Sequence, residues 1–545
     1  MIEEVIEKGI EEVIEEGEAE NALGRKIPVY IEGYGKTVPY GGLETRTPNG
    51  GRQRGKTLER QRGKKEKVLR SIEDAVAASG LKSGMTVSFH HHLRNGDRVV
   101  NAVLETCARM GIGDLTLFPT ALFDVHAPLV EHVRSGVVRR IMGSVNGAIG
   151  RMVSMGGMEV PVVLRSHGGR PRAVVSGEAP IDVAFIAAPA ADRHGNLSGR
   201  GAASGAVKSA CGSLGYAHTD AQYADCVVAL TDSLQSGVLA PVSIPQIYTN
   251  FVVELPDIGD PKGIVSGSTA VTKDPLRLLI ARYAARLIEL SPYFRDGISF
   301  QTGAGGIPLA VTAFMKEAML RKKIRGDFGL GGITGYFVEL LREGLLKRLL
   351  DVQSFDAGAI ASLESGDPAH MEISADWYAN PWNAGAAVDM LDVVVLGATE
   401  IDRNFNVNVN TEADGTLLHG IGGHQDTAAG AKLTIVAQPM MRKRVPCVVE
   451  SVHCVTTPGE TIDALATEYG VTINPRRQDL LDCVKSRGGE RAALPLVSME
   501  ELIEKALRMS GPMDLLEQED RIVAVVEWRD GSVLDVVRQV GEKTR

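Results

Sequence analysis

The chain has 545 residues, of which 44% are apolar and 23% are charged, as is usual for a globular protein. This length allows a large core and predicts more than one domain or lobe. The formal net charge of −9 disfavours a general nucleic-acid binder, which needs a basic face. A local cationic pocket for a small anion is still compatible with that charge.

The 6 cysteines are scattered along the chain and form no C-x-x-C pair. This usage predicts a reducing compartment, without a disulfide framework or a thiolate zinc site. The N-terminus lacks the apolar core of a signal peptide, and no run approaches the roughly 20 apolar residues of a membrane span. We therefore expect a cytoplasmic protein that does not enter a membrane.

The first 69 residues differ in pattern from the rest of the chain. Residues 1–20 place isoleucine and valine on one stripe among glutamates, which predicts an amphipathic helix that packs on a partner or on another copy. From Arg25 to Arg70 the chain becomes basic and rich in glycine and proline, which is typical of an extended arm. The arm is either a solvated linker or a contact for an acidic partner, and we expect a homo-oligomer.

After residue 68, short β-branched strands alternate with helical stretches. Met85–Phe89 is a candidate strand, and the next apolar pattern predicts a helix from Asp97 to Met110 that is closed by Gly111. Such alternation predicts an α/β fold built on a mainly parallel sheet with crossover helices.

The sequence also contains an internal repeat. Three pairs of segments match at offsets of 210, 208 and 211 residues: 181–196 with 391–406, 130–140 with 338–348, and 87–89 with 298–300. A near-constant offset predicts two copies of one lobe, at about residues 70–285 and 286–545, that face each other. Open parallel sheets bind ligands beyond the carboxyl ends of their strands, so we expect a shared site between the lobes.

A glycine-rich loop in the second copy is the main candidate for catalysis. The predicted strand 298–300 is followed by Gly303, Ala304, Gly305 and Gly306, and Pro308 then opens an apolar helical pattern. Glycines before a helix N-terminus leave amides sterically open at its positive end. Such amides can hold a bound anion or stabilise the oxyanion that forms when a thioester is attacked. A plain strand-to-helix turn is the alternative.

The first copy has three consecutive histidines where the second has glycines. Adjacent residues on a strand alternate faces, so at most two of these histidines could share a metal ion, and we expect no metal site. A cationic, hydrogen-bonding wall for a polycarboxylate suits His91 and Arg94 better. Surface polarity without function is the other interpretation.

Two further loops are candidates for substrate binding. One loop is cationic and flexible and comprises Ser166, His167, Gly168, Gly169 and Arg170. The other is rich in glycine and contains Gly422, Gly423 and His424. The sequence has no G-x-S-x-G elbow, no phosphate-binding P-loop and no H-E-x-x-H motif, which removes the main support for hydrolase, kinase and zinc-protease functions.

With these loops in view, the chain resembles the CoA-transferases, and within them the citrate lyase alpha subunit family. The resemblance spans about residues 70–545, and its most specific stretches are 87–91, 126–132, 166–170, 328–334, 350–356 and 405–409. It implies two similar CoA-transferase-like lobes and the exchange of acetate for citrate on a CoA-like thioester.

The resemblance also bears on mechanism. Many CoA-transferases use a nucleophilic glutamate, and aligning their motif on Phe337–Leu340 puts Gly331 or Gly332 at the position of that glutamate. A covalent glutamyl thioester is therefore not expected there. Citrate is itself a carboxylate and can attack the acetyl thioester directly, provided that the site aligns the partners and stabilises each oxyanion.

In this family the thioester is carried by a CoA-like prosthetic arm on a small acyl-carrier (gamma) subunit, while a beta subunit cleaves the citryl thioester. The resemblance implies association with both subunits, the use of citrate, acetate and acetyl-CoA, and no permanently bound cofactor. Two alternatives stay open. One is a general acyl-CoA transferase or hydrolase with Glu400 as nucleophile, and the other is a non-catalytic scaffold or metabolite sensor.

Overall fold

The computed structural model describes residues 17–43, 66–201, 207–265, 271–303, 305–488, 494–510 and 518–541. The amphipathic helix predicted within residues 1–20 lies largely outside these ranges. So does residue 304 of the predicted catalytic loop. Within the described ranges no helix is both long and apolar enough to cross a membrane.

The first lobe is built on a parallel sheet. Its seven strands follow the order β5 (Val68–Leu69), β15 (Phe251–Glu254), β13 (Cys226–Thr231), β10 (Val183–Ala187), β6 (Thr86–Phe89), β7 (Leu115–Pro119) and β8 (Val138–Ile141). The helices of this lobe are α1 (Ile72–Ser79), α2 (Val99–Arg109), α3 (Leu129–Arg134), α4 (Gly147–Ser154), α5 (Gly169–Ser176) and α6 (His218–Tyr223). The predicted strand at residues 85–89 and the predicted helix ending near Gly111 are confirmed as β6 and α2.

The second lobe repeats this plan. Its eight strands follow the order β19 (His370–Glu372), β18 (Leu346–Ser354), β17 (Gly326–Ile333), β16 (Phe300–Thr302), β20 (Val393–Leu396), β23 (Leu433–Ala437), β27 (Ala464–Thr467) and β28 (Gly470–Ile473). The strands are parallel except β28, which pairs antiparallel with β27. The helices are α7 (Pro275–Leu290), α8 (Gly306–Lys322), α9 (Gly335–Arg342), α10 (Ala357–Glu364), α11 (Ala375–Ala379), α12 (His424–Gly430), α13 (Gln478–Gly488) and α14 (Met499–Ser510).

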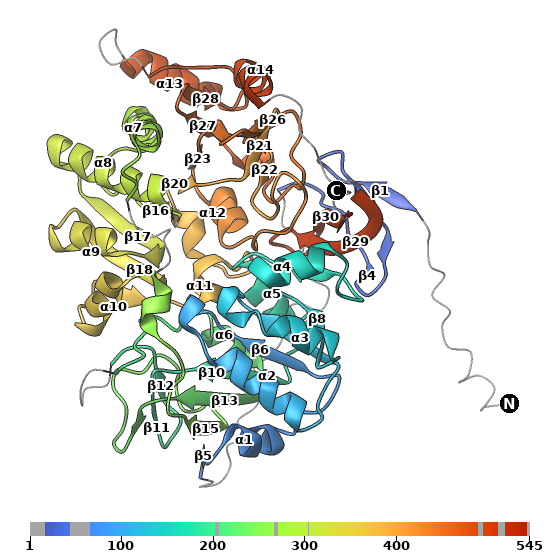
Figure 1. The fold of residues 1–545 in the computed structure, drawn as a ribbon. Coiled ribbons are helices and arrows are strands. Elements are labelled where there is room, and N and C mark those ends of the chain that lie inside the picture. The colour runs from blue at the N-terminus through green and yellow to red at the C-terminus, as the bar shows by residue number, and fades with distance from the viewer. Residues whose placement is uncertain are drawn as a thin grey trace.

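The two sheets share one strand order, which confirms the internal duplication. The run β8-β7-β6-β10-β13-β15 in the first lobe corresponds to β18-β17-β16-β20-β23-β27 in the second. In Figure 1 the helices α7, α8, α9 and α10 line the outer side of the second sheet, whereas α11 and α12 lie toward the first lobe. Helix α11 contacts α5 and α6 of the first lobe, so the lobes meet at this layer.

The repeated Asp-Arg motif forms the same turn in both lobes. After β11 (Ala190–Asp192), the Oδ1 of Asp192 accepts hydrogen bonds from the amides of residues 194 and 196. After β21 (Glu400–Asp402), the Oδ1 of Asp402 accepts from the amides of residues 404 and 406. A carboxylate that satisfies local amides is a structural device. The motif is therefore a marker of the duplication.

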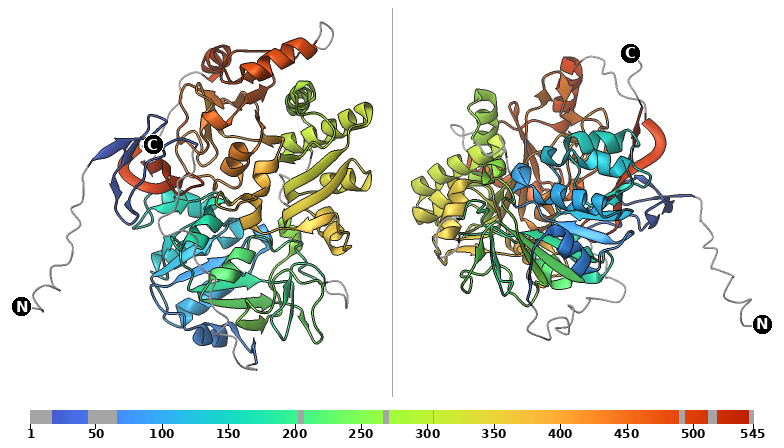
Figure 2. Two further views of the ribbon diagram at one scale, coloured as in Figure 1. Left: turned by 180° about the vertical axis from the view of Figure 1, so that it is seen from behind. Right: turned by 60° about the horizontal axis from the view of Figure 1, so that its bottom comes forward.

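A third sheet joins the end of the chain to its first third. Strand β29 (Gln518–Glu527) pairs parallel with β9 (Val162–Leu164) and antiparallel with β30 (Val533–Val540). Both views in Figure 2 show the last strands lying beside the blue N-terminal segment. The division of the chain into residues 1–69, 70–285 and 286–545 stays a prediction. Strands β29 and β30 fall in the third of these ranges, yet they form a sheet with β9, which falls in the second.

The N-terminal segment is folded where the structure describes it. Residues 17–43 form two hairpins, β1 (Glu18–Glu20) with β2 (Lys26–Pro28) and β3 (Tyr30–Ile31) with β4 (Gly35–Lys36). Ile27 and Ile31 are buried in a cluster with Val525 and Val533 of the last two strands. A solvated arm was thus the wrong prediction for residues 25–43, because Ile27 and Ile31 have a partner surface far along the sequence. Residues 44–65 lie outside the described ranges.

Candidate active site

A cavity of about 530 Å³ opens where the two lobes meet, beyond the carboxyl ends of several strands. Residues just after β6, β7 and β9 approach it from the first lobe, and residues at the ends of β16, β17, β18 and β20 from the second. The predicted residues among those that line it are His91, Arg94, His167, Gly303, Gly422, Gly423 and His424. Loops from both copies of the repeat are thus brought together at one site.

The wall of this cavity is basic. Arg94, Arg165 and Arg442 line it, and among the described lining residues there is no aspartate or glutamate. The charge of Arg165 is matched by Glu527, whose carboxylate accepts hydrogen bonds from Arg165 Nε at 2.6 Å and from Arg165 Nη2 at 2.8 Å. Arg442 donates a short hydrogen bond to the carbonyl of Ala398. The surface therefore favours an anionic ligand.

Arg94 is held between two aromatic rings. Its guanidinium carbon lies 5.0 Å from the ring centroid of Phe123 and 5.1 Å from that of Phe355, so residues of both lobes contribute to its cation–π contacts. Burial lowers the pKa of Arg94, with Tyr216 acting in the opposite direction. A guanidinium remains charged at neutral pH in such a setting.

The histidines of the cavity are neutral, which corrects the expectation of a cationic histidine wall. Burial, followed by the charge of Arg170, lowers the pKa of His167 to about 3. Burial lowers the pKa of His424 to about 4. The pKa of His91 is also lowered well below its ordinary value, by burial first and then by His167. These imidazoles offer hydrogen bonds, and the positive charge comes from the arginines.

His91 and His424 are anchored by hydroxyl groups. His91 Nδ1 lies 2.5 Å from Oγ1 of Thr120, and that oxygen also accepts from the His91 amide. His424 Nδ1 lies 2.7 Å from Oγ1 of Thr457, while its Nε2 lies 3.1 Å from the carbonyl oxygen of Gly397. Because a carbonyl can only accept, the proton of the neutral His424 ring resides on Nε2. Both nitrogens of His424 are therefore used within the protein.

The 166–170 loop is pinned by a carboxylate from the other lobe. Asp426 on α12 accepts from the Ser166 hydroxyl and from the amide of Gly168, each at 2.9 Å. The Gly169 amide in turn donates to the Ser166 hydroxyl at 2.9 Å. Burial raises the pKa of Asp426 to about 6, although Arg529 opposes that shift. These contacts hold the loop so that His167 reaches the cavity.

Arg170 lies behind the cavity wall and does not line it. Its guanidinium donates two 2.7 Å hydrogen bonds to Asp220, which is also 2.8 Å from His90 Nε2. A buried bidentate pair of this kind fixes the position of the helix that follows the loop. Its predicted contact with substrate stays a prediction, and its observed contacts are internal.

The glycine turn before α8 is only partly as expected. The helix begins at Gly306, and Gly305 at its N-cap has a φ of 153°, which a residue with a Cβ rarely adopts. First-turn amides of a helix lack acceptors within it, so those of Gly305 and Gly306 stay candidates for anion contact. The amide of Gly303 already donates to the carbonyl of Val395 at 2.9 Å, which disfavours it as an anion donor, and the catalytic role of Gly303 stays a prediction.

At Gly331 and Gly332, the positions that align with the nucleophilic glutamate of many CoA-transferases, there is no room for a side chain. A Cβ on Gly332 would come within 2.1 Å of the Phe355 ring. A Cβ on Gly331 would come within 2.6 Å of the Gln301 side chain, and Gly331 has a φ of 95°. Contacts under 3.0 Å do not occur for real Cβ atoms without a shift of the neighbour. Packing therefore requires glycine at both positions.

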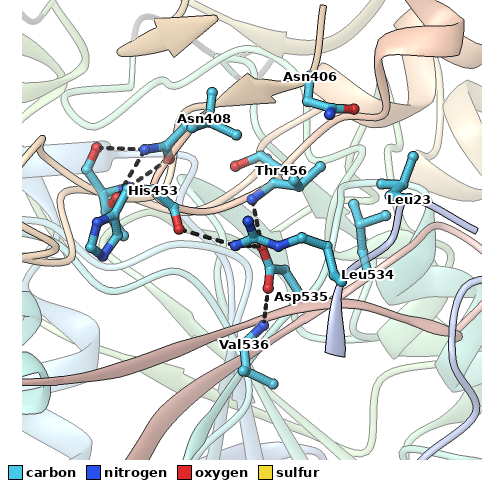
Figure 3. A network of polar contacts seen from close by, with 12 residues as sticks. Leu23, Asn406, Asn408, His453, Thr456, Leu534, Asp535 and Val536 are labelled. Carbon is cyan, nitrogen blue, oxygen red and sulfur yellow. Dashed lines mark hydrogen bonds and ion pairs between the residues drawn. The ribbon is translucent and has the colours of Figure 1, made fainter. Parts of the chain in front are cut away.

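Glu400, the alternative nucleophile, is engaged in a structural network. Its Oε2 accepts from Asn408 Nδ2 at 2.8 Å and from the His453 amide at 3.0 Å. The His453 carbonyl accepts from Arg25, whose guanidinium also pairs with Asp535 at 2.6 Å. Figure 3 shows this network running from Asn408 through His453 to Asp535. Glu400 does not line the cavity.

Sequence reasoning missed several polar residues of the cavity: Thr120, Arg165, Tyr216, Gln301, Tyr378 and Arg442. Gln301 lies in β16, two residues before the predicted glycine loop begins at Gly303, and its side-chain amide donates to the Tyr378 hydroxyl at 2.9 Å. Tyr216 and Arg442 lie in segments without a recognisable motif, so only the fold could have placed them. Among the described residues, no group of three histidine, cysteine, aspartate or glutamate side chains is arranged to hold a metal ion.

Comparison with known proteins gives a consistent result. The sequence model "Citrate lyase, alpha subunit (CitF)" matches residues 65–540. The chain is 48% identical over 504 residues to the citrate lyase alpha chain of Klebsiella pneumoniae, covering 92% of this chain and 96% of that protein. It is 46% identical over 487 residues to the Escherichia coli K12 citrate lyase alpha chain, covering 89% and 93% of the two chains.

Solved structures agree with the sequence comparison. A crystal structure described as the alpha subunit of citrate lyase from Streptococcus mutans, in complex with citrate, has a TM-score of 0.89 and 45% identity. The match covers 96% of this chain and 100% of that one. A Pseudomonas malonate decarboxylase shares only the fold, with a TM-score of 0.59, 17% identity, and coverage of 83% and 93%. On this evidence the chain belongs to the citrate lyase alpha subunit family, as the sequence motifs implied.

Proposed function

We propose that this chain catalyses the citrate CoA-transferase step of citrate lyase, exchanging acetate for citrate on a CoA-like thioester. The observation that carries the proposal is the cavity between the lobes, which presents arginines and neutral hydrogen-bond donors but no carboxylate among its described lining residues. Citrate is a polyanion, and the S. mutans relative is described as a complex with citrate. A basic site without carboxylates matches that substrate.

Direct transfer fits this site better than a covalent enzyme intermediate. A citrate carboxylate oxygen forms a bond to the acetyl carbonyl carbon, and the carbonyl electron pair moves onto its oxygen. The C–S bond then breaks, the thiolate leaves with that electron pair, and a mixed anhydride of citrate and acetate remains. The thiolate next attacks the citryl carbonyl carbon, acetate leaves, and no net proton is required.

The enzyme contributes position and electrostatics to this sequence of steps. Arg94, held by its two aromatic neighbours, is proposed to bind a citrate carboxylate. The Gly305 and Gly306 amides at the start of α8 are proposed to stabilise an oxyanion, an effect worth about 3–4 kcal/mol for each donor in studied enzymes. His91 and His167 are proposed to donate neutral hydrogen bonds to citrate, with Gly422 and Gly423 allowing its close approach.

The wider setting follows from family membership. We propose that the thioester is carried on the CoA-like prosthetic group of an acyl-carrier (gamma) subunit, and that a beta subunit cleaves the citryl thioester. We also propose that this complex works in the cytoplasm. A homo-oligomer stays a prediction.

A general CoA-transferase or hydrolase that uses Glu400 is disfavoured by the contacts of that residue. A non-catalytic scaffold is disfavoured because the cavity retains Arg94 and Arg442 on its wall and no carboxylate among its described lining residues.

The decisive test measures citrate-dependent acetate release from acetyl-CoA by the purified chain, with mass spectrometry of protein incubated with acetyl-CoA alone. We expect acetate release to require citrate and the protein mass to stay unchanged. Glu400→Gln should keep the wild-type rate, provided that its thermal unfolding shows an intact fold. A CoA or acetyl adduct that forms at the rate of turnover would overturn direct transfer, and no citrate dependence would overturn the function itself.

A further inference from the structure

Three aromatic rings meet on the wall of the cavity. The ring centroid of Tyr216 lies 4.7 Å from that of His91 and 4.6 Å from that of His167. The Tyr216 hydroxyl oxygen lies 2.6 Å from Nδ1 of His167, which is the shortest link between these rings. Tyr216 belongs to the first half of the chain, yet its buried ring packs in the apolar cluster of the second lobe with Leu330 and Tyr378. The hydroxyl therefore ties His167 to the opposite lobe.

The direction of this hydrogen bond follows from proton counting. Burial raises the pKa of Tyr216 well above its ordinary value, so the hydroxyl keeps its proton. Burial and Arg170 lower the pKa of His167 to about 3, so the ring carries one N–H at neutral pH. Were Nδ1 the donor, the buried hydroxyl proton of Tyr216 would lack an acceptor among the described residues, at a cost of about 1–3 kcal/mol. The hydroxyl therefore donates to Nδ1.

The remaining proton of His167 must then reside on Nε2. In the described part of the chain Nε2 of His167 has no hydrogen-bond partner, and His167 lines the cavity. The backbone around it is fixed as well, because the His167 amide donates to the Gly422 carbonyl at 2.8 Å. One ring nitrogen is thus committed to Tyr216, and the other is left for a ligand.

We propose that Tyr216 is a positioning residue, which holds His167 as a neutral Nε2–H donor to the carboxylate or oxyanion bound in the cavity. This inference rests on the proposed function. A neutral donor stabilises developing negative charge without protonating the attacking carboxylate or the leaving thiolate, both of which must stay anionic for direct transfer. His424, by contrast, has its Nε2–H committed to a carbonyl, so His167 has a role that His424 cannot share.

Tyr216→Phe is the direct test, because it removes the hydroxyl and leaves the packed ring. Nδ1 then becomes free to take a proton, so the pKa of His167 rises and a second N–H tautomer is populated. We expect kcat/KM for citrate to fall about tenfold, which corresponds to one hydrogen bond, and the titration of the His167 ring, followed by ¹⁵N NMR, to move to higher pH. In ¹⁵N-histidine spectra, His167→Gln identifies the signals of His167 because it removes them. In Tyr216→Phe these signals should no longer show an accepting Nδ1 and a protonated Nε2.

Two further variants separate positioning from general stability. Tyr40→Phe is the matched control, since Tyr40 is also buried and its hydroxyl donates at 2.6 Å to Glu460, and neither of these residues lines the cavity. It should lose similar stability and keep wild-type kinetics. His167→Gln places a neutral amide N–H near the position of Nε2, and it should retain part of the activity and be insensitive to Tyr216→Phe.

The proposal fails if Tyr216→Phe keeps the wild-type kcat/KM and the wild-type titration of the His167 ring. It also fails if Tyr216→Phe loses as much activity in the His167→Gln background as in the wild type, because that result marks a structural role. The spectroscopic readout needs no turnover. A wild-type protein without transferase activity but with the Nε2–H tautomer would therefore reject the proposed function and keep the tautomer assignment.

Discussion

Burial decides what the polar residues of the cavity can do. A histidine in water is the side chain that changes charge near neutral pH, and the sequence therefore suggested a cationic wall. In the folded chain His91, His167 and His424 are neutral, and the charge is left to guanidinium groups. The sequence identified these histidines among the residues that gather here, while their protonation states depended on packing that no motif encodes.

The low pKa of His424 predicts a pH-dependent stability. The folded pKa of about 4 lies below the unfolded value of 6.5, so the unfolded chain binds more protons between these values and stability falls as pH decreases through that window. From pH 7 to pH 5 this residue should reduce the free energy of unfolding by about 2 kcal/mol. Urea unfolding of His424→Gln should show a shallower loss, whereas the exposed His194→Gln should follow the wild type.

Gly332 offers a second test at the level of single residues. Its added Cβ would meet the Phe355 ring, which also packs on Arg94. Gly332→Ala should cost about 1–3 kcal/mol of stability through overpacking and should raise KM for citrate by displacing the Arg94 guanidinium. Gly385→Ala is the control, because nothing lies within 4 Å of its added Cβ. Equal KM values for the two variants would show that the ring does not position Arg94.

At the level of elements, the internal repeat predicted the arrangement of the strands reliably. Matched segments at a constant offset predicted two equivalent sheets, and the strand orders agree from β8 to β15 and from β18 to β27. Hydrogen bonds between distant segments were not predictable. The Gly303 amide pairs with Val395, and Tyr216 reaches His167, through contacts that only the completed tertiary structure specifies.

Helix α12 illustrates how one element controls another. Asp426 near its start accepts from the Gly168 amide, and burial raises the pKa of this carboxyl to about 6. Protonation as pH falls through 6 removes negative charge that holds the loop, so kcat/KM for citrate should decline below that pH. Asp426→Asn should lower kcat/KM and flatten this part of the pH profile, because an amide presents only one accepting oxygen. An unchanged slope in the variant would assign the pH dependence to another group.

On the scale of the whole molecule, the N-terminal hairpins and the last strands form one structural unit. Arg25 pairs with the buried Asp535, which also accepts from the amides of Val455 and Val536. The composition of residues 25–70 as a whole, which is basic and rich in glycine and proline, predicted a solvated arm for this region, although most of those basic residues lie after residue 43. The few side chains that are buried, rather than the average composition of the segment, determined where the segment lies.

The Arg25–Asp535 pair predicts a measurable coupling between the two ends of the chain. Arg25→Met leaves a buried carboxylate without its cation, which costs about 3–5 kcal/mol in fully buried pairs. Because the Arg25 side chain is 28% exposed, we expect a smaller loss in urea unfolding, about 2 kcal/mol. Arg193→Met, which breaks an exposed pair with Glu66, should change stability by less than about 1 kcal/mol. Equal losses would remove the special role of the buried pair.

The pairing of β9 with β29 has a consequence for biosynthesis. Strand β9 directly precedes the loop that carries His167, and its neighbour in the sheet is made only when residues 518–527 are translated. The ribosome therefore completes most of both lobes before β29 can pair with β9 and before Glu527 can reach Arg165. A nascent or prematurely terminated polypeptide would lack a finished substrate pocket, so competence for acyl exchange arises only after the final strands emerge.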